Sequence, residues 1–185
     1  MSNLSYIDTK KSIELGRLIS NKSTLDKVEE ITDIIVWSTL CIAIVFSPIF
    51  TYFIVTIQNS NDVFVAFIFF PLIILFGLFA LYRKLMEKKL IKVDTFLSKH
   101  KNRHYLLDFL KSKGYQVIAK NNDVVIVNLE ESLSFNNIWT KNISFLIDDN
   151  SIYFTMTKSY PRINPPVFFA HISLKTDLKK YFKDK

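Results

Sequence analysis

Two long uncharged runs constrain this chain more than any other feature. Residues 34–57 and 63–82 contain no Asp, Glu, Lys, Arg or His, and only the five residues QNSND separate them. A bilayer core about 30 Å thick needs roughly 20 apolar helical residues, which both runs supply. We therefore predict an α-helical transmembrane hairpin. A pair of buried globular helices and a cleaved signal peptide are the alternatives, and the length and position of the runs disfavour both.

The positions of Lys and Arg predict an orientation for this hairpin. The loop over residues 58–62 contains neither, whereas residues 83–92 contain Arg83, Lys84, Lys88, Lys89 and Lys92. Because basic residues are retained on the cytoplasmic side of a membrane, we predict that both termini are cytoplasmic. The expected localisation is therefore multi-pass in the inner (cell) membrane.

The hairpin divides the chain into three predicted parts. Residues 1–33 form an N-terminal segment, residues 34–82 the hairpin, and residues 83–185 a basic domain with 19 Lys plus Arg, 10 Asp plus Glu and a net charge of +9. This charge favours anionic partners such as lipid or nucleotide. The single cysteine, Cys41, lies in the first run, which excludes a disulfide framework and a Cys-based metal site.

The pattern of residues 83–185 predicts a small α+β domain. Residues 83–93 are expected to continue the second helix, and Asp94 to cap a helix over residues 95–113 that Gly114 ends. Two runs rich in β-forming residues follow on either side of residues 121–123, and two more flank residues 148–150, so about four mainly antiparallel strands are expected. After a proline-rich loop at 159–166, residues 167–181 favour a helix, with a strand followed by a helix as the alternative.

The densest basic cluster predicts a phosphate site. Lys99 and Arg103 lie four residues apart on the predicted helix and share a face, and Arg offers a fork of donors to phosphate oxygens. His100 and His104 also share a face, but no glutamate or third ligand accompanies them, and we predict no metal. A solvated helix face is the alternative explanation of the whole cluster.

A second group combines cations with aromatic rings. Lys158, Tyr160 and Arg162 surround the proline-rich loop, and Trp139 lies beside Lys141. Such groups suit a nucleobase and its phosphate, because bases stack on aromatic faces. The alternative is that the rings pack on the sheet. The predicted ligand site comprises Lys99, Arg103, His104, Trp139, Lys158, Tyr160 and Arg162.

Signatures of catalysis are absent from the sequence. It contains no GxSxG, P-loop or GxGxxG, and its three glycines are Gly16, Gly77 and Gly114. We predict that the protein is not an enzyme, uses no cofactor and does not bind DNA.

The predicted layout, a two-span hairpin followed by a basic domain without a catalytic motif, resembles the membrane effectors of type III CRISPR antiviral defence. The resemblance rests on architecture and charge and transfers no site residue. It implies a cytoplasmic domain that binds cyclic tetra-adenylate, assembly as a tetramer, and perturbation of the membrane by an oligomeric pore. Two spans are too few to enclose a pore alone, which also favours a homo-oligomer.

Two other functions fit the same features. A membrane immunity protein that neutralises an inner-membrane-targeting toxin would need no nucleotide, although the loop at 58–62 offers it little outer surface. A structural anchor that recruits a partner is the third possibility. Binding of cyclic oligoadenylate by the basic domain would discriminate the first function from the other two.

Overall fold

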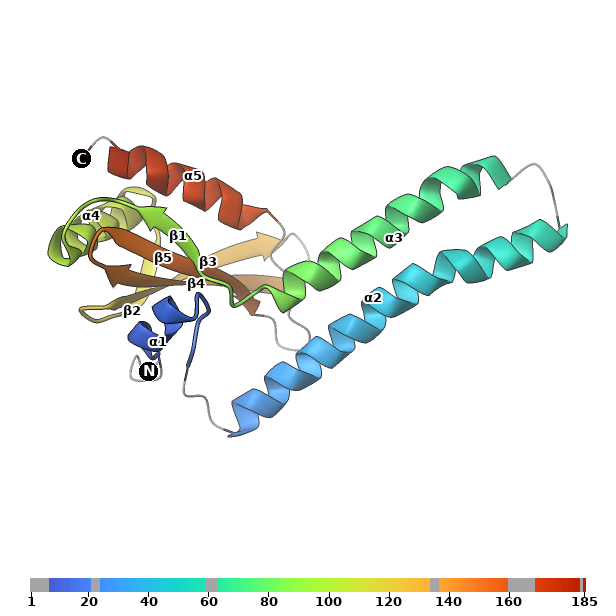
Figure 1. Cartoon of the computed structure of the whole chain (residues 1–185), viewed down its shortest axis with the longest axis horizontal. Coiled ribbons are helices and arrows are strands. Elements are labelled where there is room, and N and C mark those ends of the chain that lie inside the picture. Colours follow the sequence, from blue (N-terminus) through green and yellow to red (C-terminus); the bar gives the residue numbers. More distant parts are fainter. Residues whose placement is uncertain (1–6, 21–23, 59–62, 134–136, 160–168, 184) are drawn as a thin grey trace. The chain divides into compact units, whose positions relative to one another are not determined.

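The chain forms two compact units. The computed structural model describes residues 7–20, 24–58, 63–133, 137–159, 169–183 and 185, and everything below concerns those residues (Figure 1). One unit covers residues 26–86 and is helical. The other combines the N-terminal residues 1–25 with residues 87–185 and contains the sheet.

The helical unit is built from α2 (Thr24–Gln58) and α3 (Val63–Leu85). An ion pair joins the two helices, with Lys84 Nζ 2.6 Å from Asp33 Oδ2 and both side chains largely buried. Further along, Gly77 allows a close approach, because a Cβ added there would lie 3.1 Å from a Val45 methyl and 3.5 Å from the Cys41 carbonyl oxygen. One charged contact and one small residue thus set the pairing of the helices.

The prediction of a transmembrane hairpin over residues 34–57 and 63–82 is contradicted. Among the residues that the structure describes, no helix is long and apolar enough to cross a membrane. The predicted multi-pass localisation with cytoplasmic termini is contradicted by the same finding.

The second unit contains one five-stranded antiparallel sheet, in the order β1-β5-β4-β3-β2. The strands are β1 (Ile91–Asp94), β2 (Gln116–Lys120), β3 (Val124–Leu133), β4 (Asn137–Asp148) and β5 (Ser151–Ser159). The two predicted strand pairs correspond to β2–β3 and β4–β5, each joined by the turn that the sequence indicates. The predicted number of strands was one too few.

The additional strand is β1, where the sequence analysis expected a helix. Ile91 pairs with Phe154 and Val93 with Ile152. The Val93 side chain is fully buried. Ile91 and Val93 suit a strand, whereas Lys92 and Asp94 do not, and pairing with β5 satisfies the backbone of this segment and buries its apolar face. Tertiary pairing therefore outweighs the local pattern.

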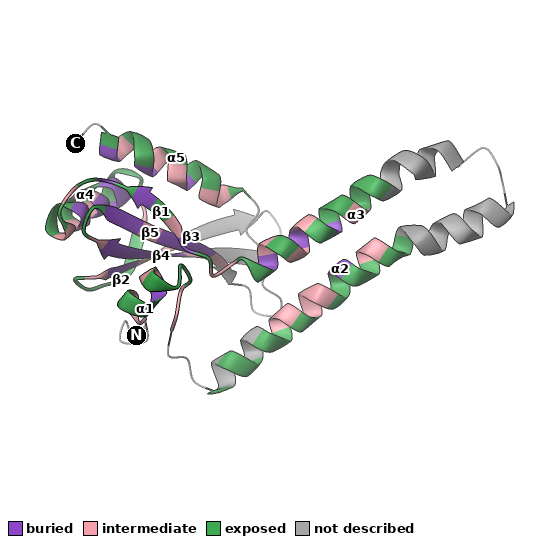
Figure 2. Cartoon of the chain, viewed as in Figure 1, coloured by how far each residue is buried: buried purple, intermediate pink, exposed green. Residues whose placement is uncertain are grey.

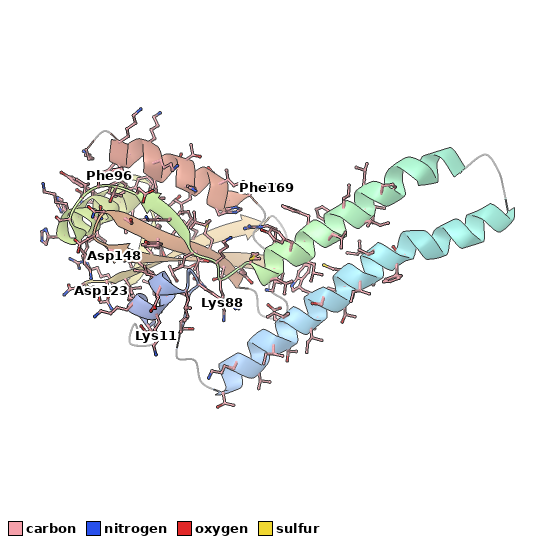
Figure 3. The ribbon with its side chains drawn as sticks, viewed as in Figure 1. Lys11, Lys88, Phe96, Asp123, Asp148 and Phe169 are labelled. Atoms are coloured by element: carbon pink, nitrogen blue, oxygen red, sulfur yellow. The ribbon has the colours of Figure 1, made fainter. Side chains whose placement is uncertain are left out.

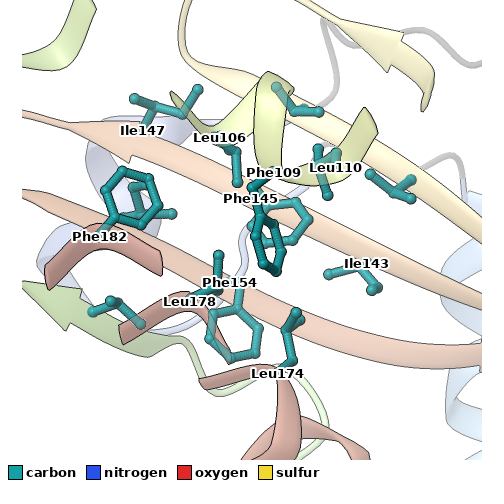
Figure 4. Close-up of a cluster of buried hydrophobic side chains, with 14 of the residues drawn as sticks. Leu106, Phe109, Leu110, Ile143, Phe145, Ile147, Phe154, Leu174, Leu178 and Phe182 are labelled. Carbon is teal, nitrogen blue, oxygen red and sulfur yellow. The ribbon is translucent and has the colours of Figure 1, made fainter. Parts of the chain in front are cut away.

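Two helices cover one face of the sheet and form the main core. These are α4 (Lys99–Ser112) and α5 (Ala170–Lys183), whose apolar sides meet alternate residues of the central strands (Figure 4). Phe145 and Phe154 lie at the centre with their ring centroids 6.0 Å apart. Figure 2 shows the buried residues concentrated on the strands and on the inner sides of these helices. The core therefore fixes α4 and α5 side by side over one sheet face.

The opposite face is covered at one end by the N-terminal segment. Helix α1 (Thr9–Glu14) begins at Asp8, whose side chain accepts a hydrogen bond from the Lys11 amide. Ile13 and neighbouring apolar residues pack against a small second core that contains Val124 and Leu146. The alternation along β3 and β4 places these two residues on the face away from α4 and α5.

The ends of α4 are defined by local chemistry. Ser98, rather than the expected Asp94, is its N-cap, since Asp94 belongs to β1. At the other end Gly114 has φ +69°, and the Tyr115 amide donates to the Leu110 carbonyl oxygen, which is the expected glycine stop. Helix α4 is thus shorter at its start than predicted and ends where predicted.

Candidate functional site

The structure places Lys99 and Arg103 together at one corner of the α+β unit. Lys99 Nζ forms an ion pair with Asp123 Oδ1, and Arg103 Nε donates to the Asn121 carbonyl oxygen at 3.2 Å. Asn121 in turn accepts hydrogen bonds from the Asp123 and Val124 amides through its side chain. Both predicted cations are therefore engaged with the β2–β3 turn, and a phosphate would have to compete with Asp123 for Lys99.

The start of α4 is occupied in the same way. Asp149, in the β4–β5 turn, accepts a hydrogen bond from the Lys99 backbone amide at 2.9 Å. Its carboxylate takes the place at a helix N-terminus that an anionic ligand would use. Asp123 and Asp148 lie at this end of the unit (Figure 3). The contacts at this corner therefore join α4 to the β2–β3 and β4–β5 turns, and they occupy the groups that were predicted to bind a phosphate.

Two further predicted residues, Lys158 and Trp139, lie away from this corner. Lys158 lies in β5 opposite Lys141, and Trp139 lies in β4 opposite Glu131. Since β4 reaches the corner only at Asp148, its residue 141 is about 23 Å away at roughly 3.3 Å per residue. Tyr160 and Arg162 lie outside the described residues. The predicted site is thus divided between opposite ends of β4.

His104 lies beside a surface that was not predicted from the sequence. Its Nε2 lies 3.4 Å from Asp108 Oδ2, and its ring centroid lies 5.7 Å from that of Tyr105. Tyr105 is half-buried and faces α5, where its ring contacts Phe182 edge-on with the centroids 6.5 Å apart. The line of contact between α4 and α5, which we call the α4–α5 seam, is therefore lined with aromatic rings.

Cations lie directly over the rings of this seam. Lys185 Nζ is 5.6 Å from the Tyr105 ring centroid and 5.5 Å from that of Tyr181. On the same side, Lys113 Nζ is 6.0 Å from the Phe109 centroid and 3.1 Å from Asp177 Oδ2 of α5. Ammonium groups at these distances are attracted to the ring faces. The seam thus combines partly exposed rings with positive charge, the combination required to hold a base and a phosphate.

The charge of the two helices extends this surface. Helices α4 and α5 contain eight Lys plus Arg and two acidic residues, Asp108 and Asp177, which gives a net charge of +6. Most of the chain's net charge of +7 therefore lies on two adjacent helices over one sheet face. A concentration of one charge on one layer attracts polyanions and raises their association rate.

The missed residues carried a weak sequence signal. Lys175, Lys179, Lys180 and Lys183 recur through the last helix, interleaved with Tyr181 and Phe182. This pattern marks a basic amphipathic helix. It does not indicate which helix lies beside it, and the contact of Tyr181 with Phe109, whose ring centroids are 5.2 Å apart, could not be foreseen.

Two pKa shifts describe the electrostatics around these helices. The hydrogen bond from Lys92 holds the pKa of Asp94 below its ordinary value, and the charge of Lys179 on α5 lowers that pKa further. Burial raises the pKa of the Tyr115 phenol, whose ring meets Phe109 edge-on. Asp94 therefore remains ionised beside α5 and neutralises part of its positive charge.

Metal binding has no supporting geometry in the described ranges. No group of three or more His, Cys, Asp or Glu side chains there could hold a metal ion. The chemistry that the described seam offers is stacking, charge attraction and hydrogen bonding by ammonium groups.

Comparison with protein-family models and with curated proteins finds no match to this chain.

Proposed function

We propose that the α+β unit is a receptor for an anionic nucleotide and that the α4–α5 seam is its binding surface. The observation that carries the proposal is the position of Lys185 Nζ over both Tyr105 and Tyr181. Two partly exposed rings flank one position there, and the two basic helices surround it. A base that displaces Lys185 from one tyrosine face, with its phosphate on the released ammonium group and neighbouring lysines, would use both features.

Cyclic tetra-adenylate is the first ligand to test. It carries several bases and phosphates, and a homo-oligomer such as a tetramer would present the same rings and cations in several copies. In this proposal the protein acts as a binding effector in antiviral defence rather than as an enzyme. The helical unit would receive the signal, and ligand binding would shift its state only through a difference in affinity between two states.

A titration of the full chain tests the proposal. Cyclic tetra-adenylate, linear tetra-adenylate and ATP are compared by calorimetry at two salt concentrations. Tyr105→Leu and Tyr181→Leu keep an apolar side chain in the seam and remove the ring face. Each is expected to weaken binding by about 1–3 kcal/mol for one lost stack. Lys10→Ala, at an exposed position of α1, is the control and should bind like the parent.

The outcomes separate the site from the function. If the parent protein binds none of the three nucleotides, the proposed function is wrong. If the parent binds but both tyrosine variants bind equally well, the nucleotide uses another surface. Binding through phosphates should also weaken with added salt, with a slope in log units of about −0.7 per phosphate contact for a single strand.

A further inference from the structure

Phe96 combines two unusual properties. Its φ is +57°, in the left-handed region that bulky L-residues rarely adopt, and its side chain is 85% exposed. Only one other non-glycine residue in the described ranges has a positive φ, and that residue, Asn150, belongs to a type that tolerates it. The Phe96 side chain therefore neither lowers the strain of a positive φ nor packs in the core.

The backbone around Phe96 is held firmly. The Thr95 and Phe96 amides both donate to the Asn150 carbonyl oxygen, at 2.9 and 3.2 Å, and the Asn150 amide donates to the Leu97 carbonyl oxygen at 2.9 Å. These bonds join the loop between β1 and α4 to the β4–β5 turn. The ring is therefore exposed on a backbone that these hydrogen bonds hold in place, at the position labelled in Figure 3.

Strain of this kind accumulates where the surrounding structure enforces it, and it occurs most often at functional sites. An exposed aromatic ring on a rigid backbone also loses little conformational entropy when a ligand covers it, which favours binding. Both properties point to a contact residue rather than a structural one.

The surroundings of Phe96 carry charges of both signs. The loop leads directly into α4, so Phe96 lies three residues before Lys99. Tyr105, in the seam, is only about 9 Å further along the helix from Lys99 at 1.5 Å per residue. Lys179 of α5 is near enough to Asp94, two residues before Phe96, to lower the pKa of that carboxyl group. The exposed ring therefore lies between Asp94, whose carboxylate is near Lys179, and the first turn of α4, where Asp149 accepts a hydrogen bond from the Lys99 amide. A ligand there meets cations and carboxylates together, so the ring face itself supplies the main attraction.

We infer that Phe96 is a second stacking platform of the nucleotide-binding surface, which takes a base adjacent to the one bound at the seam. This inference rests on the proposed function and adds a specificity: a ligand with two or more bases gains from Phe96, whereas a mononucleotide does not. A covalent step is not involved.

The experiment compares the stability and the nucleotide affinity of two kinds of variant at position 96: those that remove the ring and tolerate a positive φ, and one that keeps an aromatic ring. Phe96→Gly and Phe96→Asn both accommodate a positive φ. They should leave the urea midpoint of unfolding unchanged or higher, and should weaken binding of tetra-adenylate by about 5- to 150-fold, the loss that corresponds to one base stack. Phe96→Trp should keep the affinity. Leu15→Ala removes another exposed apolar side chain, 67% exposed, and should have no effect on binding.

ATP provides the internal comparison, because it has a single base. Its affinity should be the same for the parent and for Phe96→Gly. The inference is overturned if Phe96→Gly binds tetra-adenylate as tightly as the parent while Tyr105→Leu does not, and the proposed function then stands. A lower urea midpoint for both Phe96→Gly and Phe96→Asn would show that the ring is structural and would also overturn it. Failure of the parent to bind any nucleotide overturns both proposals.

Discussion

Asn102 provides a sharp test of how the α+β unit is held together. Its side chain is fully buried, and its Nδ2 donates to the Leu97 carbonyl oxygen at 3.1 Å and to the Asp148 carbonyl oxygen at 2.9 Å. One amide thus joins α4 to the loop before it and to the end of β4. Replacement by aspartate keeps the shape of the side chain but removes both donors.

The size of the effect follows from these contacts. Loss of two hydrogen bonds at about 0.5–1.5 kcal/mol each predicts that Asn102→Ala lowers the free energy of unfolding by about 1–3 kcal/mol, before any cavity cost. In Asn102→Asp a carboxylate oxygen would face two carbonyl oxygens in a buried site. Burial can raise the pKa of such a group by about 3 units, and each unit costs about 1.4 kcal/mol. At pH 7 the aspartate variant should therefore lose about 4 kcal/mol or more.

The pH dependence has a definite sign. In Asn102→Asp, the folded-state pKa of the introduced carboxyl group would exceed its unfolded value of about 3.9, so the unfolded state ionises first as the pH rises. The extra loss is therefore small near pH 4, where the unfolded state begins to ionise, and grows until the pH passes the folded-state pKa.

Hydrogen exchange of β4 and β5 peptides, at increasing urea and at pH 4, 5, 6 and 7, would measure the loss in this unit alone. Asn122→Asp, in the exposed β2–β3 turn, is the matched control. A pH-independent difference between Asn102→Asp and Asn102→Ala would refute the reasoning.

Three further outcomes follow from the packing and the charges. Gly77→Leu should overpack the α2–α3 contact and lower the free energy of unfolding by about 1–3 kcal/mol. It should also make the buried Cys41 thiol reactive toward an alkylating reagent, and unchanged protection of the thiol would contradict this. Phe154→Ala should destabilise the sheet unit by about 3–5 kcal/mol in urea unfolding, because the side chain is fully buried; a loss below about 1 kcal/mol would contradict the assigned core. Lys92→Met should raise the pKa of Asp94 toward its ordinary value in an NMR titration, because the hydrogen bond that lowers this pKa is removed. The stability linked to the lowered pKa is present above the pKa of Asp94 in the unfolded state, and it is lost as the pH falls through the pKa in the folded state.

The strand pairs of the sheet were predictable because their turns are local. Asp148, Asp149 and Asn150 form a short connection between two β-rich runs, and Asn150 adopts φ +63°, which its side chain tolerates. The turn at Asn121 is fixed by that residue's own side chain. In both cases the information lies within a few residues, so a sequence pattern is sufficient.

β1 and the ends of α4 show where local information is insufficient. Val93 becomes buried only because β5 lies beside it, and β5 is about 60 residues further along the chain. Aspartate is a common N-cap residue, but Asp94 pairs with Ser151 in the sheet and therefore belongs to a strand. A long-range partner therefore decides between two structures that the local sequence allows.

The candidate site depends on long-range partners even more strongly. Lys99 and Arg103 were correctly placed on one helix face, because a spacing of four is a property of the helix itself. What the spacing cannot show is that Asp123 and Asn121 already contact these cations. A cation that has an acidic partner must give up that contact before it can bind a phosphate, so density of basic residues alone overstates the strength of a site.

The same reasoning favours the seam. Tyr105 and Tyr181 come from helices separated by most of the sheet in sequence, and only the shared core beneath α4 and α5 brings them under one ammonium group. That core is apolar and fully buried, so the geometry above it is fixed by packing rather than by the lysines themselves. Loss of a seam lysine should therefore change ligand affinity without moving the rings, whereas loss of a core side chain such as Leu178 should displace both. On a surface whose rings are positioned independently of its charges, the base and the phosphate contribute separately to the binding free energy. The tyrosine and phenylalanine variants would measure the contribution of the bases, and the salt dependence would measure that of the phosphates.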